Sequence, residues 1–212
     1  MEDADFIVDT HIQASGKDWA LVEMAETCIR EGNLGAAEQI AVRLTGPELK
    51  DRVKEKLGAA FAESGDTEKA RSIAETISDL TRRSSVIAAI AKYQVKSGDI
   101  DLGEKTAMDI TDRDHKIAVY TRIAEKRAEL GEIDSAVETV EMMAKMIENA
   151  PRAPDVSKFG VFDDSFKRGA VQTVYLGAAK TSARNGDAES YNKFIAKAIE
   201  GVKEINDTPV WK

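Results

Sequence analysis

Histidine and cysteine side chains, which could bind a metal or act as nucleophiles, are scarce in this chain. The 212 residues include two histidines, His11 and His115, and one cysteine, Cys28. Two imidazoles are too few for a zinc or non-haem iron site built on histidine. We interpret His115, in a charged stretch between predicted helices, as a solvated loop residue. Cys28 occupies a helix packing position, which favours a small buried hydrophobe over a reactive thiol.

Acidic side chains are plentiful, but their distribution is that of solvated helix surfaces. The chain has 38 Asp and Glu against 30 Lys and Arg, and no carboxylate pair stands out as a general acid and base. The glycines are isolated, so none forms a phosphate-binding loop, and a Gly-x-Ser-x-Gly elbow is absent. We therefore predict no catalytic, metal-binding or cofactor-binding residues and no enzyme activity. An accessory subunit, whose partner supplies the catalytic residues, remains an alternative.

The charge and composition limit the classes of partner. A formal net charge of −8 argues against nucleic acid as the main ligand, because such binding rests on a basic surface. With 42% hydrophobic and 32% charged residues, the chain has the balance of a folded soluble protein. No run approaches the ~18 apolar residues that a membrane span needs. A single cysteine favours a reducing cytoplasm.

Five glycines, each followed by Asn, Asp or Glu, set the spacing of the elements that would position any site. Gly32, Gly65, Gly98 and Gly131 follow one another at intervals of 33 residues. Gly186 comes after 55 residues, which is one further period plus an insertion of 22. A period of this size is typical of stacked repeats. The repeats span residues 18–50, 51–83, 84–116, 117–149 and 172–204, and position 1 of each is Asp18, Asp51, Ser84, Ile117 and Gln172.

Apolar and small residues recur at fixed offsets on both sides of each glycine, with the 3.6-residue period of a helix. Before it they are Met24-Ala25, Leu57-Gly58, Ile90-Ala91, Ile123-Ala124 and Ala178-Ala179, followed by Ile29, Ala62, Val95, Ala128 and Ala183. After it they are Ala37, Ala70, Gly103 and Ala136, then Ala41, Ala74, Ala107 and Val140, then Leu44, Ile77, Ile110 and Met143. Each repeat is therefore predicted to be a helix, a tight turn and a second helix, with the glycine ending the first helix and the polar residue capping the second.

This pattern resembles the tetratricopeptide repeat over about 165 residues. That family has small residues at positions 8 and 20 and apolar or small residues at positions 24 and 27, which match the offsets above. The period of 33 departs from the usual 34, the expected proline is missing, and Gly103 and Tyr191 replace alanine at position 20. A related helical-hairpin repeat fits equally well. The resemblance implies an all-α, right-handed solenoid of about five antiparallel helical hairpins.

The resemblance also implies a concave groove lined by the first helix of each repeat. The lining residues would include Trp19, Arg52, Glu55, Lys92, Lys96, Thr121, Glu125, Glu129, Lys180 and Arg184. An ordinary charged helix face is the alternative interpretation for each of them. As a set, they are the predicted contacts with an extended partner segment.

The residues between repeats four and five carry a second candidate surface. This insertion, residues 150–171, has two prolines and the aromatic residues Phe159, Phe162 and Phe166. Either the segment packs its phenylalanines on the repeats, or it projects them as a docking element. Residues 1–17 are predicted to form a tail or cap, and residues 205–212 a C-terminal tail.

Together these features predict a non-catalytic interaction module: a cytoplasmic scaffold, adaptor or assembly factor that binds a protein or peptide through the groove, the insertion or both. RNA binding by helical-hairpin repeats is the second hypothesis. Association of copies through exposed ends of the repeat array is a further one.

Overall fold

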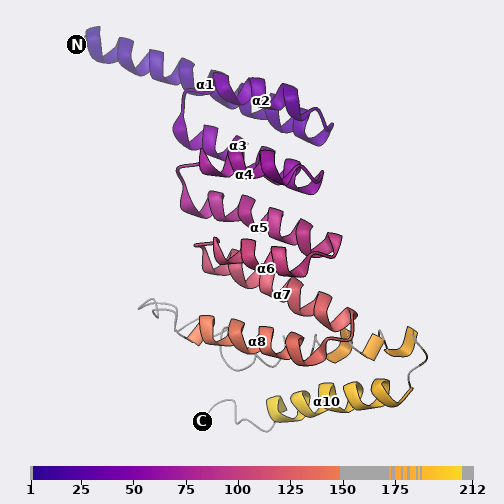
Figure 1. Cartoon of the computed structure of the whole chain (residues 1–212). Coiled ribbons are helices and arrows are strands. Elements are labelled where there is room, and N and C mark those ends of the chain that lie inside the picture. The colour runs from indigo at the N-terminus through magenta and orange to yellow at the C-terminus, as the bar shows by residue number, and fades with distance from the viewer. Residues whose placement is uncertain are drawn as a thin grey trace, which may run out of the picture. The chain divides into compact units, whose positions relative to one another are not determined.

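The computed structural model describes residues 2–148 and 188–206, together with residues 172, 175–177, 179–180, 182–184 and 186. Every regular element within these ranges is an α-helix (Figure 1). The aromatic residues of the insertion, Phe159, Phe162 and Phe166, lie outside the described residues, as does the C-terminal segment 207–212.

The helices follow the predicted repeats, with long first helices and mostly shorter second helices. Their bounds are α1 Glu2–Arg30, α2 Leu34–Arg43, α3 Pro47–Glu63, α4 Thr67–Glu75, α5 Leu80–Ser97, α6 Ile100–Met108, α7 Arg113–Glu129, α8 Ile133–Glu148 and α10 Ala188–Asn206. Helix α1 includes residues 2–17, which the sequence predicts to be a tail or cap. Its N-terminal part extends beyond α2 (Figure 1).

The glycine turns have the predicted geometry. All five turn glycines have positive φ, between 73° and 99°, a conformation that costs glycine little and other residues more. Three of the following residues cap the second helix by accepting a hydrogen bond from the backbone N–H three residues on. The distances are 3.2 Å for Asn33, 3.0 Å for Asp66 and 3.1 Å for Asp99. Each cap satisfies a donor that has no partner within the helix.

The buried residues largely match the predicted packing positions. The positions at nine and twelve residues after the first four turn glycines are all buried, as predicted. Two predicted core residues are exposed instead: Met24, with 52% of its surface accessible, and Ala183. Met24 lies in the first of the five repeats and Ala183 in the fifth.

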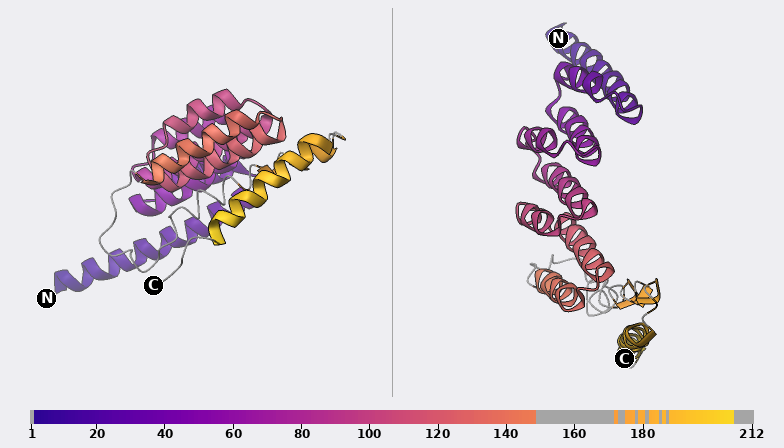
Figure 2. Two further views of the ribbon diagram at one scale, coloured as in Figure 1. Left: turned by 90° about the horizontal axis from the view of Figure 1, so that it is seen from below. Right: turned by 45° about the vertical axis from the view of Figure 1, so that its right-hand side comes forward.

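The chain divides into two compact units. Unit 1 combines the residues up to Tyr93 with Lys105–Lys116, and unit 2 combines Gln94–Glu104 with the residues from Ile117 onward. In unit 1, α1 packs on α2 and α3 packs on α4, and both α1 and α2 contact α3 (Figure 2). One hairpin is therefore stacked on the next.

Polar side chains at position 1 hold the connections between hairpins in unit 1. Asp18 is buried and accepts hydrogen bonds from the backbone N–H groups of Thr45 (3.1 Å) and Gly46 (2.7 Å). The next two repeats have the same arrangement at the same spacing. Asp51 accepts from the Ser78 and Asp79 amides at 2.9 and 3.0 Å, and Ser84 accepts from those of Thr111 and Asp112 at 3.3 and 3.0 Å. We call these contacts the position-1 clasps.

Repeat four lacks this clasp and has a longer second helix. Its position 1 is the buried Ile117, which has no polar side-chain atom to accept such bonds. Helix α8 has 16 residues, whereas α2 has 10 and α4 and α6 have 9 each. A clasp satisfies backbone N–H groups where the chain leaves the second helix. Helix α8 is described as far as Glu148.

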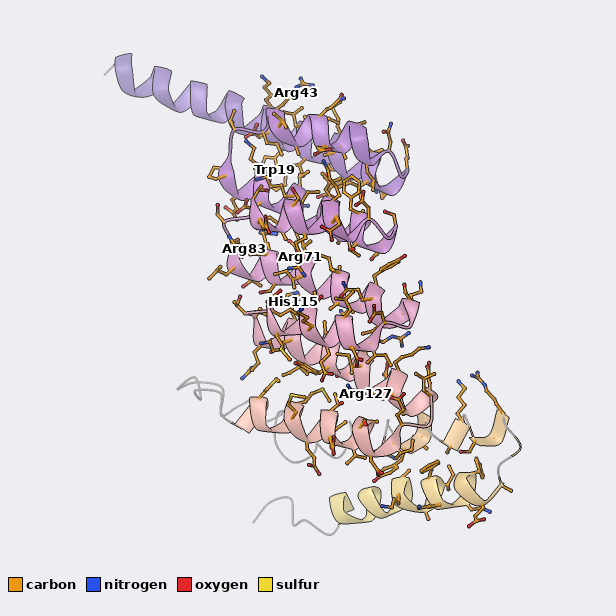
Figure 3. All side chains as sticks on the ribbon, in the orientation of Figure 1. Trp19, Arg43, Arg71, Arg83, His115 and Arg127 are labelled. Atoms are coloured by element: carbon orange, nitrogen blue, oxygen red, sulfur yellow. The ribbon has the colours of Figure 1, made fainter. Side chains whose placement is uncertain are left out.

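In unit 2, an ion pair and a hydrogen bond join three helices. The Arg127 guanidinium on α7 donates to Glu104 on α6 and to the Thr139 hydroxyl on α8, each at 2.6 Å (Figure 3). Tyr120 is buried nearby; its burial, and secondarily the charge of Glu104, raise the pKa of its hydroxyl. The rings of Tyr175 and Phe194 stack at 6.5 Å in the fifth repeat.

Candidate partner-binding surface

An exposed tryptophan marks the surface formed by the first helices of unit 1. Trp19 on α1 has 49% of its surface accessible, and the Arg52 guanidinium on α3 lies 5.5 Å from the centre of its ring (Figure 3). This is the distance of a cation–π contact. The contact covers part of the ring and leaves the rest of the indole accessible.

An ion-pair network fixes Arg52 in this position. Its Nη2 lies 2.9 Å from Glu26 Oε1, and the second carboxylate oxygen is 2.7 Å from Lys56 Nζ. Burial would raise the pKa of Glu26, but Lys56 and Arg52 outweigh it and lower that pKa. The carboxylate therefore stays ionised at neutral pH. We call Trp19, Glu26, Arg52 and Lys56 the Trp19 cluster.

The helical period and the repeat period together assemble this cluster. Trp19 and Glu26 are seven residues apart, and Arg52 and Lys56 are four apart, so each pair lies on one face of its helix. Trp19 and Arg52 both occupy position 2, one repeat apart, and stacking of the hairpins brings them together. The sequence identified Trp19 and Arg52 as lining residues but missed Glu26 and Lys56. Their opposite charges at positions 9 and 6 of successive repeats were the available signal.

The predicted basic lining residues are exposed and available for contacts. Lys92 and Lys96 lie one turn apart on α5, and Lys180 and Arg184 have the same spacing in the fifth repeat. Within the described part of the chain, none of the four has an ion-pair partner. Like charges at this spacing slightly destabilise a helix, so an anionic partner would relieve that repulsion.

The predicted lining residues of α7 are engaged within their own helix. The Thr121 hydroxyl donates to the Ile117 carbonyl at 2.9 Å. Glu125 pairs with Arg122 at 3.1 Å, and Glu129 pairs with Lys126 at 3.3 Å. These exposed pairs contribute little to stability. Because each pair joins one acidic and one basic residue, the four paired residues add no net charge to the α7 face.

His115 and Cys28, the residues that could bind a metal or react, have structural contacts instead. His115 Nδ1 lies 2.7 Å from Asp112 Oδ1 at the start of α7, where the His115 backbone N–H also donates to that carboxylate and lowers its pKa. Cys28 is half-buried and packs against two core clusters, as its helical position predicted. Among the described residues, no group of three or more His, Cys, Asp and Glu side chains is placed to hold a metal ion.

The described residues thus define an all-helical protein built from repeated antiparallel hairpins, with an aromatic and charged surface on its first helices. None of the helices described is both long enough and apolar enough to cross a membrane. No protein-family model matches the chain, and no curated protein matches it. A solved structure of a mutant of MamA is similar to it with a TM-score of 0.42 and 14% identity, covering 88% of this chain and 98% of that one. This likeness does not assign the chain to a family.

Proposed function

We propose that this protein is a non-catalytic scaffold, adaptor or assembly factor that binds an extended segment of a partner protein on the Trp19 cluster. The observation that carries this proposal is the accessible indole of Trp19, held beside Arg52 by the ion pairs of Glu26. Tryptophan and arginine are the residues most enriched among those that dominate binding energy at protein interfaces. An exposed tryptophan that binds nothing would not need an ion-paired arginine held beside it.

The cluster is preorganised, which favours binding. Arg52 and Glu26 are already paired and partly desolvated in the free protein, so a partner would order few additional side chains. Less conformational entropy is then lost on association. The partner segment would place an apolar or aromatic side chain against the indole.

The exposed basic residues indicate the partner's charge. Lys92, Lys96, Lys180 and Arg184 would attract carboxylate side chains, chiefly by raising the rate of encounter. The right-handed solenoid of about five hairpins and the cytoplasmic location stay predictions of the sequence. Docking through Phe159, Phe162 and Phe166 also stays a prediction.

A peptide-display screen tests this function directly. A library of random linear peptides is selected on the full-length protein, and enriched peptides are measured by fluorescence anisotropy against the wild type and the Trp19→Ala variant. We expect Trp19→Ala to weaken their binding roughly 30-fold, the effect of a ~2 kcal/mol interface residue.

Met108→Ala is the matched control, because Met108 is a large apolar side chain that is 64% exposed on α6 and distant in sequence from the cluster. It should leave peptide binding unchanged. The proposal fails if no peptide is enriched over an unrelated helical protein. It also fails if the enriched peptides bind the Trp19→Ala variant as tightly as the wild type.

A further inference from the structure

One face of α1 is exposed, although the same face is buried in the following three repeats. At position 3, Val53, Val86 and Val119 are fully buried, whereas Ala20 is exposed. At position 7, Leu57, Ile90 and Ile123 are buried, whereas Met24 is 52% exposed. None of the described residues covers these two positions of α1 as α1 and α2 cover those of α3. We call this surface of Ala20 and Met24 the α1 face.

The second repeat shows what kind of element fits such a face. Val53 belongs to a buried cluster with Val22 of α1 and with residues of α2. Leu57 belongs to a second cluster that contains Ala37 of α2. Positions 3 and 7 of repeat two therefore share buried clusters with positions 5 and 20 of repeat one. The natural cover for the α1 face is a hairpin of this same type.

The fifth repeat exposes the complementary positions. Its position 5 is Leu176, which is 46% exposed, while Val22 and Ala88 are buried at that position. Its position 20 is Tyr191, which is 39% exposed, while the earlier repeats have fully buried alanines or a buried glycine there: Ala37, Ala70, Gly103 and Ala136. Ala183 at position 12 is exposed as well. Large apolar side chains thus lie accessible where the internal repeats bury small ones.

At one of the two pairs of positions, the side-chain sizes on the two surfaces are complementary. Between repeats one and two, Val22 at position 5 is matched by Val53 at position 3. The corresponding pair from the two exposed surfaces is Leu176 with Ala20, which conserves the total volume closely, as packed interfaces require. The second pair, Tyr191 with Met24, is larger than the internal pair of Ala37 with Leu57, and its attraction is a thioether–aromatic contact at partly exposed side chains.

We propose that copies of this chain associate head to tail, with the fifth repeat of one copy packing on the α1 face of the next. Leu176 and Tyr191 of one copy would meet Ala20 and Met24 of the other. Such a contact is heterologous, so each added copy offers the same exposed surface again. Association would therefore continue beyond a dimer as the protein concentration rises, unless a ring closes.

Two single substitutions separate this contact from any symmetric one. Met24→Glu blocks the α1 face, and Tyr191→Glu blocks the fifth repeat. Both residues are exposed in the chain, so both variants should keep the wild-type helical circular dichroism and melting temperature. If either variant fails this check, Ala20→Arg or Leu176→Glu replaces it. Met108→Glu is the matched control, because Met108 is exposed and belongs to neither surface.

Sedimentation velocity over a range of protein concentrations gives the readout. We expect the mean mass of the wild type and Met108→Glu to rise past that of a dimer, while each blocking variant alone stays a monomer. An equimolar mixture of the two blocking variants should form a one-to-one dimer and nothing larger, because one intact surface of each kind remains.

Three results would overturn the proposal. The first is a wild type that stays monomeric at every concentration. The second is association that only Met24→Glu abolishes, which indicates a symmetric contact between two α1 faces. The third is association that neither variant abolishes. The proposed peptide binding is tested separately, because Trp19→Ala should leave self-association intact and Met24→Glu should leave peptide binding intact.

Discussion

At the scale of single residues, Asp18 links the stability of unit 1 to pH. The Gly46 backbone N–H and the Thr45 hydroxyl donate to its carboxylate and lower its pKa, and these hydrogen bonds outweigh the opposing effect of burial. The pKa of Asp in an unfolded chain is about 3.9. A carboxyl group whose pKa is lower than this in the folded state stabilises the fold at pH values above the unfolded-state pKa. This stabilisation is lost as the pH falls through the folded-state pKa.

The Asp18→Asn variant should expose this dependence. We expect it to be less stable than the wild type, with a constant difference in unfolding free energy between about pH 5 and 7, because Asp18 is ionised in both states there. Below about pH 4 the difference should shrink as the wild-type carboxyl becomes protonated. Urea denaturation at a series of pH values measures it, with the exposed Glu63→Gln as the control for loss of one negative charge. A difference that grows on acidification would contradict the assigned role.

The position-1 clasps were missed from the sequence although their signal was present. In the sequence, Asp18, Asp51 and Ser84 do not stand out as contact residues, because polar residues near a predicted helix start are common and exposure to solvent usually explains them. Their partners have a pattern too: Thr45, Ser78 and Thr111 all occupy position 28. Two polar positions that recur together at a spacing of 27 residues indicate a contact between elements, which a search for apolar periodicity does not detect.

At the scale of elements, close packing of α3 against α5 depends on Gly58. A methyl group added there would lie 2.7 and 3.1 Å from the two γ-carbons of Val86, far closer than packed carbons approach. Val86 is fully buried, and β-branched side chains in helices have little rotamer freedom to move aside. The sequence predicted this position to be small, and the structure gives the physical reason.

Gly58→Ala should therefore destabilise the protein even though alanine favours helices. Overpacking costs about 1–3 kcal/mol, which exceeds the gain of about 1 kcal/mol in helix propensity. Gly35→Ala in α2 is the matched control, because nothing lies within 4 Å of its added methyl group. It should stabilise by roughly 0.5 kcal/mol. Urea midpoints at unchanged m-value give both effects. Equal shifts for the two variants would refute the packing explanation.

The hairpins could be predicted from the sequence more fully than the surfaces could. Glycine at the turn and alanine at the helix contacts are local requirements, and each recurs every 33 residues. Met24 was predicted to be buried because its position is apolar in every repeat. Its exposure differs from that of Leu57, Ile90 and Ile123 at the same position, a difference that a repeat average conceals. The support of Arg52 by Glu26 likewise required knowledge of how two hairpins stack.

At the scale of the whole molecule, the net charge of −8 opposes contact between copies. This repulsion acts over the Debye length, about 30 Å at 0.01 M salt and about 8 Å at 0.15 M. The contact proposed between the fifth repeat and the α1 face involves apolar side chains, Leu176 and Tyr191 with Ala20 and Met24, whose burial salt does not weaken. Added salt would therefore weaken the charge repulsion between copies and leave the apolar contact unchanged.

Head-to-tail association should accordingly strengthen when the salt concentration rises from about 0.01 to 0.15 M. Sedimentation velocity at fixed protein concentration measures this as an increase in mean mass, and the Met24→Glu variant should remain monomeric at both salt concentrations. RNA binding, the second hypothesis drawn from the sequence, has the opposite salt dependence, because counterions released from phosphates weaken it as salt rises. If wild-type association weakens as salt rises, charge pairs hold the copies together. The proposed contact between Met24 and Tyr191 would then be wrong.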